Sequence, residues 1–155
     1  MLAQPRIVSM QEKPAEALDP IVGTWTLDRS QSQFPTVTGV PRVKDQTESY
    51  REANGRIELR LVRILEDGAQ VVGRLTWPTG GGIVQVVDGP VSSGESYVET
   101  RLIAGDWLVT YLLDGRQYGT MRKTVSPDGR TMQQHFRGVL QGTTIDVQQV
   151  FTRVR

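Results

Sequence analysis

The strongest evidence for the fold of this chain of 155 residues lies in residues 95–130, ESYVETRLIAGDWLVTYLLDGRQYGTMRKTVSPDGR. Three turn pairs, Gly105-Asp106, Asp114-Gly115 and Asp128-Gly129, divide it at the spacing of β-hairpins. Asp-Gly pairs tolerate the positive φ angles that tight hairpin turns require. The segments between them are rich in Val, Thr, Leu, Tyr and Trp, which suit a pleated, half-buried surface. The stretch therefore predicts three consecutive antiparallel strands.

The same rhythm of turn pairs and β-forming segments continues along most of the chain. It predicts ten strands: Ile21–Asp28, Asp45–Glu52, Arg56–Leu65, Gln70–Trp77, Ile83–Asp88, Glu95–Ile103, Asp106–Leu113, Gln117–Val125, Arg130–Gly138 and Thr144–Arg153. Because most neighbours are joined by hairpin turns, the expected fold is all-β, an antiparallel up-and-down (meander) β-barrel of about 8–10 strands. We expect a single barrel domain over residues 20–155, preceded by a flexible N-terminal tail over 1–19.

Composition excludes several classes of function. The 18 basic and 17 acidic residues leave a net charge of +1, so we expect no nucleic-acid partner. No apolar run approaches the roughly 20 residues of a membrane helix, so we expect no membrane span. Cysteine is absent, which removes disulfides and thiolate chemistry. The first twenty residues lack the apolar core of a signal peptide. Both a cytoplasmic location and a periplasmic or secreted one, after a signal has been trimmed, fit these residues, as do a monomer and a homodimer.

One long interruption separates the first two predicted strands, over Arg29–Lys44. Pro35, Gly39 and Pro41 forbid a long helix there, and Phe34 is a candidate apolar contact. Two interpretations stay open. The loop is either a flap over one mouth of the barrel or a connection whose Phe34 plugs the barrel end.

Three short motifs resemble a known family. The first predicted strand carries Gly23-Thr24-Trp25, Arg153 lies near the end of the last, and residues 125–132 read VSPDGRTM. Together they resemble the calycin superfamily, which includes lipocalins and fatty-acid-binding proteins. The closer resemblance is to the lipocalin-like family of small, mostly uncharacterised bacterial proteins. The resemblance implies a structural role for Gly23, Trp25 and Arg153, with the tryptophan closing the narrow end of the barrel and the arginine lying over its ring.

Trp25 and Arg153 also indicate which side chains face the interior, because alternate residues of a strand point to opposite faces. On the last strand the predicted inward set is Ile145, Val147, Gln149, Phe151 and Arg153. On the preceding strand it is Met132, Gln134 and Phe136. On Glu95–Ile103 we expect Val98, Thr100 and Leu102 inside, with Tyr97, Glu99 and Arg101 outside. Both faces of Asp106–Leu113 are apolar, so its inward set stays open. The interior is expected to be mostly apolar with a few uncharged polar groups.

Few residues offer chemistry. The single histidine, His135, falls on the outward face, and we expect it at the surface rather than in a pocket. The pairs Glu48 with Glu52, and Glu95 with Glu99, are interpreted as solvated partners of arginines. The triple glycine 80–82 leads into a strand rather than a helix, so it does not predict a phosphate site. We expect no metal site and no cofactor.

The sequence favours a binding function, in which an internal apolar cavity holds a small hydrophobic molecule that enters between Arg29–Lys44 and the hairpin at Thr79–Gly82. Predicted ligand-binding residues are Phe34, Trp77, Trp107, Tyr111, Gln134, Phe136 and Gln149. The alternative is a cofactor-independent enzyme, an isomerase, cyclase, lyase or hydrolase, acting on a small hydrophobic molecule in the same barrel with His135 and Tyr111 as catalytic residues. An interaction protein with a filled core is a third possibility.

Overall fold

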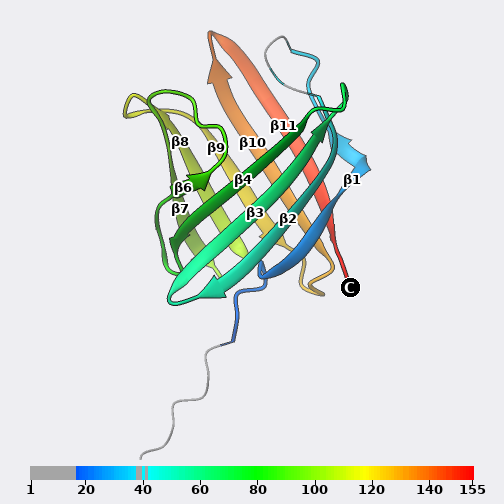
Figure 1. Ribbon diagram of the computed structural model, residues 1–155, viewed down its shortest axis with the longest axis vertical. Coiled ribbons are helices and arrows are strands. Elements are labelled where there is room, and N and C mark those ends of the chain that lie inside the picture. The colour runs from blue at the N-terminus through cyan, green and yellow to red at the C-terminus, as the bar shows by residue number, and fades with distance from the viewer. Residues whose placement is uncertain (1–16, 38–39, 41) are drawn as a thin grey trace, which may run out of the picture.

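The computed structural model describes residues 17–37, 40 and 42–155. In these residues eleven strands form one antiparallel sheet, which curls into a nearly closed barrel (Figure 1). The strands are β1 (Gly23–Gln33), β2 (Val43–Ala53), β3 (Arg56–Leu65), β4 (Gln70–Pro78), β5 (Gly81–Ile83), β6 (Gln85–Asp88), β7 (Glu95–Ile103), β8 (Asp106–Leu113), β9 (Arg116–Val125), β10 (Thr131–Leu140) and β11 (Thr143–Arg153). The predicted all-β meander is confirmed. No helix in this part of the chain is long and apolar enough to cross a membrane.

The barrel is closed by one segment that is split between two neighbours. In the order β5-β7-β8-β9-β10-β11-β1-β2-β3-β4-β6 the sheet ends on β5 and β6, which are consecutive in the chain. β5 pairs with β7 and β6 pairs with β4, so the fifth predicted strand is present but divided. The last bond to β7 is donated by the Val84 N–H to the Tyr97 carbonyl at 3.0 Å. Beyond Val84 no pairing between β6 and β7 is found, which leaves a gap in the ladder of the described barrel wall.

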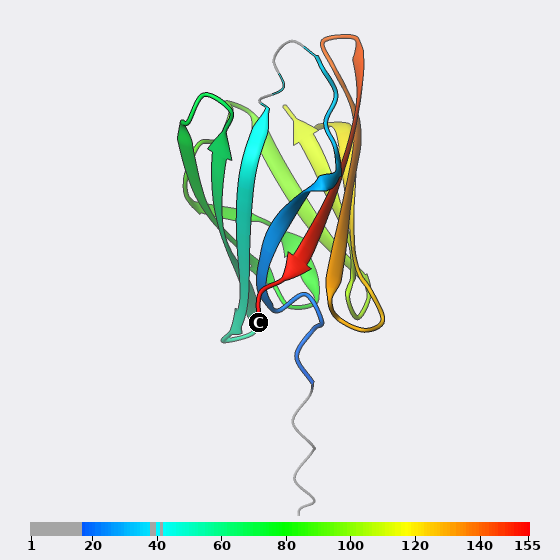
Figure 2. The same cartoon turned by 90° about the vertical axis from the view of Figure 1, so that its right-hand side faces the viewer.

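Alternation of strand direction gives the barrel two distinct ends. The β1–β2, β3–β4 and β6–β7 connections lie at one end, here called the open end, and the chain enters β1 and leaves β11 at the other, the closed end (Figure 2). The hairpin Thr79–Gly82 is at the closed end, where the Thr79 N–H donates to the Gly55 carbonyl at 3.0 Å. The prediction that this hairpin and Arg29–Lys44 flank one mouth is therefore wrong. Three strands, β2, β3 and β4, separate the two connections, and only an even number would bring them to the same end.

The first connection is also shorter than predicted, because β1 continues to Gln33 and β2 begins at Val43. A bulge between Asp28 and Gln33 makes the extension possible. There the Asp28 carboxylate accepts bonds from the Ser30 hydroxyl at 2.6 Å and the Gln31 amide at 2.7 Å. These polar side chains, which read as loop in the sequence, stabilise an irregular strand.

Trp25 and Arg153 lock the closed end. The Trp25 ring is fully buried and its indole N–H donates to the Ile21 carbonyl at 2.8 Å. The Arg153 guanidinium lies 4.2 Å from the centroid of that ring and donates to the carbonyls of Pro20, Val22 and Gly129 at 2.5–2.7 Å. Gly23 has φ of +139°, and a Cβ there would lie 2.3 Å from Arg153 Nη1. These contacts bind the first and last strands to the segment that precedes β1.

Asp19 belongs to the same closed end. Its carboxylate accepts bonds from the Arg101 guanidinium at 2.9 Å, the Trp107 indole at 3.3 Å and backbone N–H groups of Ile21 and Gly105. Asp19 is 6% exposed. Of the tail predicted over 1–19, residues 1–16 lie outside the described residues, and the last residue is part of the barrel.

Candidate functional site

The barrel encloses a cavity of about 320 Å³ between its centre and its open end. Its walls come from β2, β3, β4, β6 to β11 and the loop after β6. The aliphatic and aromatic lining residues are Tyr50, Leu59, Leu61, Val71, Leu75, Trp77, Val84, Val86, Tyr97, Val109, Tyr111 and Met121. The polar lining residues are Gln46, Glu48, Arg63, Asp88, Glu99, Lys123, Gln134 and Gln149. A cavity of this kind, mainly apolar with a few convergent polar groups, is typical of small-molecule sites.

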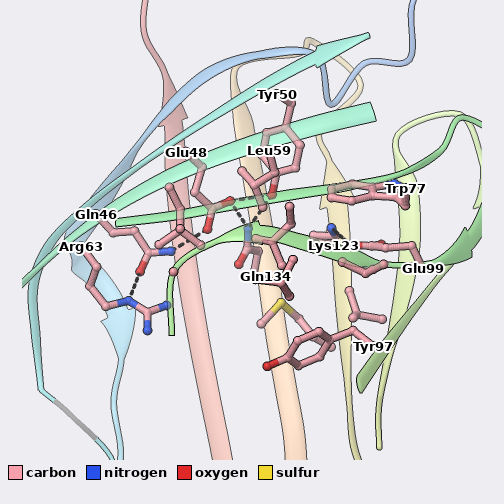
Figure 3. A pocket seen from close by; sticks show the side chains of 18 of the residues that line it. Gln46, Glu48, Tyr50, Leu59, Arg63, Trp77, Tyr97, Glu99, Lys123 and Gln134 are labelled. Atoms are coloured by element: carbon pink, nitrogen blue, oxygen red, sulfur yellow. Dashed lines mark hydrogen bonds and ion pairs between the residues drawn. The ribbon is translucent and has the colours of Figure 1, made fainter. Parts of the chain in front are cut away.

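Six of these residues form one buried polar cluster in the middle of the barrel. Gln46, Glu48, Tyr50, Glu99, Lys123 and Gln134 are each between 2% and 4% exposed. Figure 3 shows them converging from opposite walls. We call this set the polar cluster. It lies between the closed end, packed with Trp25, Trp107, Met132 and Phe151, and the cavity.

Glu48 is the acceptor at the centre of one half of the polar cluster. Its carboxylate accepts bonds from the Tyr50 hydroxyl at 2.6 Å, from Gln134 Nε2 at 2.7 Å and from Gln46 Nε2. Gln46 in turn accepts a bond from Arg63 Nε at 2.8 Å, nearer the open end. Burying a carboxylate is costly unless its oxygens are hydrogen-bonded, and here three neutral donors satisfy it.

Glu99 and Lys123 form the other half as a buried ion pair. Lys123 Nζ also lies 4.8 Å from the centroid of the Trp77 ring and 5.5 Å from that of Tyr50. Burial raises the pKa of the Glu99 carboxyl, against the opposing effect of the Lys123 ammonium. Among the described residues, Glu99 Oε2 and the Trp77 indole N–H are buried without a protein partner. This half of the polar cluster therefore combines a poorly solvated carboxyl with a cation held over two aromatic faces.

The sequence prediction for β7 is wrong, because Glu99 is buried and Tyr97 lines the cavity while Leu102 is 46% exposed. The interpretation of Glu48 and Glu99 as solvated partners of surface arginines is wrong for the same reason. The prediction assumed that the apolar face of each strand points inward. On β7 the inward face is the polar one. Lys123 pairs with Glu99 there, and the rings of Trp77 and Tyr50 lie against the ammonium group.

Other strands follow the predicted parity. Ile145, Gln149 and Phe151 on β11, and Met132 and Gln134 on β10, are buried. The register supports this, because Trp25 pairs with Arg153 across β1 and β11. The face of β8 that the sequence left open is resolved by burial of Trp107 and Val109.

The predicted ligand-binding residues divide into two groups. Trp77, Tyr111, Gln134 and Gln149 line the cavity. Trp107, Phe136 and Phe34 do not line it: Trp107 is fully buried beside Asp19, and the Arg29 guanidinium covers Phe34 at 4.8 Å. The Phe136 ring fills the space above Gly119 and Gly138, where a Cβ would lie 2.7 Å from its Cζ.

The two candidate catalytic residues lie on different sides of the wall. His135 Nε2 is 2.7 Å from Asp146 Oδ1 on the outer face, away from the cavity, as the alternation predicted for this residue. Tyr111 lines the cavity, and burial raises the pKa of its hydroxyl well above the usual range. Its hydroxyl is therefore a donor at neutral pH, and a base for chemistry in the cavity would have to come from the polar cluster.

Arg63 is one of the cavity residues that the sequence-based prediction missed. It lies near the end of β3, and among the side chains that the structure describes only that of Gln46 engages it, through Nε. Within the described residues its guanidinium forms no ion pair. An arginine on a wall otherwise made of Leu and Val, at an inward position of an alternating strand, is the signal that could have revealed it.

Comparison with known proteins shows no family for this chain. No family model and no curated protein sequence matches the chain. Among solved structures, the chain is similar to Ex-FABP, a siderocalin described as functioning through dual ligand specificities. The two are 9% identical, the match covers 87% of this chain and 74% of that one, and the TM-score is 0.38. A likeness of this size identifies no ligand for this chain.

Proposed function

We propose that this protein binds one small amphiphilic molecule in the cavity of its barrel. The observation that carries the proposal is the cavity of about 320 Å³, walled by aliphatic and aromatic side chains and provided with polar groups at its inner and outer limits. Its volume is that of about ten water molecules in the liquid, which suits a ligand with on the order of ten to fifteen non-hydrogen atoms.

Apolar burial supplies the affinity. Leu61, Leu75, Val86 and Met121 offer side chains that are only partly covered by the protein itself. A ligand that buries about 200 Å² of apolar surface there gains about 5 kcal/mol before the cost of association, at about 25 cal/mol per Å². On its own this gain corresponds to a dissociation constant no tighter than about 0.2 mM, so polar contacts must add to it. The walls favour compact, partly aromatic molecules.

Polar groups orient the ligand. The Arg63 guanidinium offers donors near the open end, while Gln149 and the Tyr111 hydroxyl offer hydrogen-bonding groups deeper in the cavity. Donors outnumber acceptors on this list, because both Arg63 and Tyr111 donate. The ligand we propose therefore carries oxygen acceptors rather than being a pure hydrocarbon.

Native mass spectrometry and isothermal calorimetry with compact aromatic alcohols, acids and aldehydes test this proposal. Two neighbouring substitutions on β3 give a matched comparison, because Leu61 lines the cavity and Val62 does not. We expect Leu61→Trp to fill the cavity and weaken binding at least about tenfold, and Val62→Trp to leave it unchanged. Absence of binding by every compound in this size range, or equal loss in both variants, would overturn the proposal.

A further inference from the structure

Lysine is rare in this chain, and one of the few lysines lines the cavity. The sequence has three lysines, Lys13, Lys44 and Lys123, against fifteen arginines. Lys44 is exposed on β2 and Lys13 lies outside the described residues, whereas Lys123 is 3% exposed and lines the cavity. Arginine binds carboxylates better but does not lose its proton in proteins, whereas a buried lysine can become a neutral amine. The one interior cation of the polar cluster is thus the type that can act as a nucleophile.

The surroundings of Lys123 Nζ favour a positive charge at that atom. The Glu99 carboxylate pairs with it, and the faces of Trp77 and Tyr50 lie 4.8 and 5.5 Å away (Figure 3). Aromatic faces attract cations, and a desolvated contact of this kind contributes appreciably. Any reaction that keeps one positive charge on the nitrogen keeps these interactions.

We propose that Lys123 captures small aldehydes in the cavity as a protonated imine, with Glu99 as the proton carrier and counter-ion. This inference rests on the proposed function, because the aldehyde must first occupy the cavity. It names the ligand class more closely: a compact molecule, about ten non-hydrogen atoms in size, with a terminal carbonyl that reaches the polar cluster.

The steps balance in atoms and charge. Glu99 takes a proton from the Lys123 ammonium, and the neutral amine attacks the carbonyl carbon, so that a C–N bond forms as the C=O π pair moves onto oxygen. A proton then passes from the nitrogen to that oxygen and gives the neutral carbinolamine. The Glu99 carboxyl then returns its proton as the carbinolamine hydroxyl leaves as water. The product is a protonated imine opposite the Glu99 carboxylate, formed from one aldehyde and one ammonium with release of one water.

Glu99 suits the role of proton carrier. Its carboxyl is 4% exposed, and its second oxygen, Oε2, has no protein partner among the described residues. Burial raises the pKa of this carboxyl, which brings its protonated form within reach during the reaction. Glu48, by contrast, has its oxygens engaged by three donors and is not available to exchange a proton with Lys123.

The test treats the full-length protein with cinnamaldehyde and cyanoborohydride, which reduces an imine to a stable amine, and maps the modified lysine by peptide mass spectrometry. We expect one cinnamyl group per chain, located at Lys123, formed at least about tenfold faster than at the exposed Lys44. Lys123→Arg, which keeps the charge, should abolish this fast reaction, and Glu99→Gln should slow it at least about tenfold. The site mapping on the unsubstituted protein requires no variant to fold.

Cinnamyl alcohol separates this inference from the proposed function, because it fits the same cavity and forms no imine. Binding of the alcohol, with labelling no faster at Lys123 than at Lys44, would overturn imine formation and leave the binding function standing. If the alcohol does not bind and Lys123 is not labelled, both imine formation and the proposed binding function are wrong. Fast labelling at Lys123 that excess alcohol suppresses supports both together.

Discussion

Replacing Lys123 by methionine tests the energetics of the polar cluster directly. Methionine fills similar space but leaves Glu99, which is 4% exposed, without its counter-ion. Removing one partner of a buried pair is strongly destabilising because an uncompensated charge remains. The Glu99 carboxyl can lose its charge by taking up a proton. The free energy of that protonation sets the upper limit of the loss in folding stability.

The limit follows from the ordinary pKa of glutamate, 4.5 in the unfolded chain. At pH 7 protonation over about 2.5 pH units costs about 3.4 kcal/mol, at about 1.36 kcal/mol per unit, and at pH 5 it costs about 0.7 kcal/mol. A raised folded pKa means that the folded state holds the proton longer than the unfolded one, so stability falls as pH rises above 4.5. Lys123→Met should therefore be much less stable at pH 7 than at pH 5.

Urea unfolding of four proteins, the unsubstituted chain, Lys123→Met, Glu99→Gln and the double variant, measures this effect. The double variant has no buried charge at either position, so at pH 7 it should be about 2 to 3.4 kcal/mol more stable than Lys123→Met alone. At pH 5 the two should agree within about 1 kcal/mol. Equal stability at pH 7, or a difference that does not change between pH 5 and 7, would show that no uncompensated charge is buried at Glu99 in Lys123→Met.

Three further outcomes are expected from the rest of the molecule. Arg153→Ala should cost about 3 kcal/mol in urea unfolding, because charged hydrogen bonds to three carbonyls and the contact with Trp25 are lost, whereas Arg155→Ala should cost less than about 0.5. The hydrogen bond from His135 lowers the pKa of Asp146, so its stabilisation is present above pH 3.8 and is lost as pH falls; Asp146→Asn should flatten the stability profile in that acidic range. His135→Gln should leave the calorimetric affinity for cavity ligands unchanged, because the ring lies on the outer face.

Local signals predicted the strands well because hairpin turns are set by a few residues. Asn54 and Asp114 adopt φ of 53° and 48°, as the turn pairs indicated. The extension of β1 past Asp28 was missed because it depends on side-chain bonds within a bulge, which hydrophobic alternation cannot show. The division of one strand at Val84 depends on which neighbour each half meets across the barrel.

The candidate site was predicted only where the interior is uncharged. The prediction placed Gln134 and Gln149 inside because residues at alternate positions of the same strands are apolar, and both are buried. Glu99 was placed outside by the same rule, since a carboxylate on an isolated strand is expected in solvent. Its burial is made possible by Lys123, which lies 24 positions later, and no pattern within β7 reports that partner.

The location of the polar cluster bears on why the barrel keeps it. A buried ion pair seldom stabilises a protein more than well-packed apolar residues of similar volume would. The closed half of this barrel is filled in that apolar way, by Trp25, Met132 and Phe151. Apart from Asp19 and Arg153 at the closed end itself, the interior charges lie where that packing stops and the cavity starts, at Glu48, Glu99 and Lys123. If they served only the core, replacement of the Glu99–Lys123 pair by Gln and Met would leave every ligand affinity intact. We expect instead a stable barrel that still binds cinnamyl alcohol and no longer retains the aldehyde, because the pair serves the occupant of the cavity.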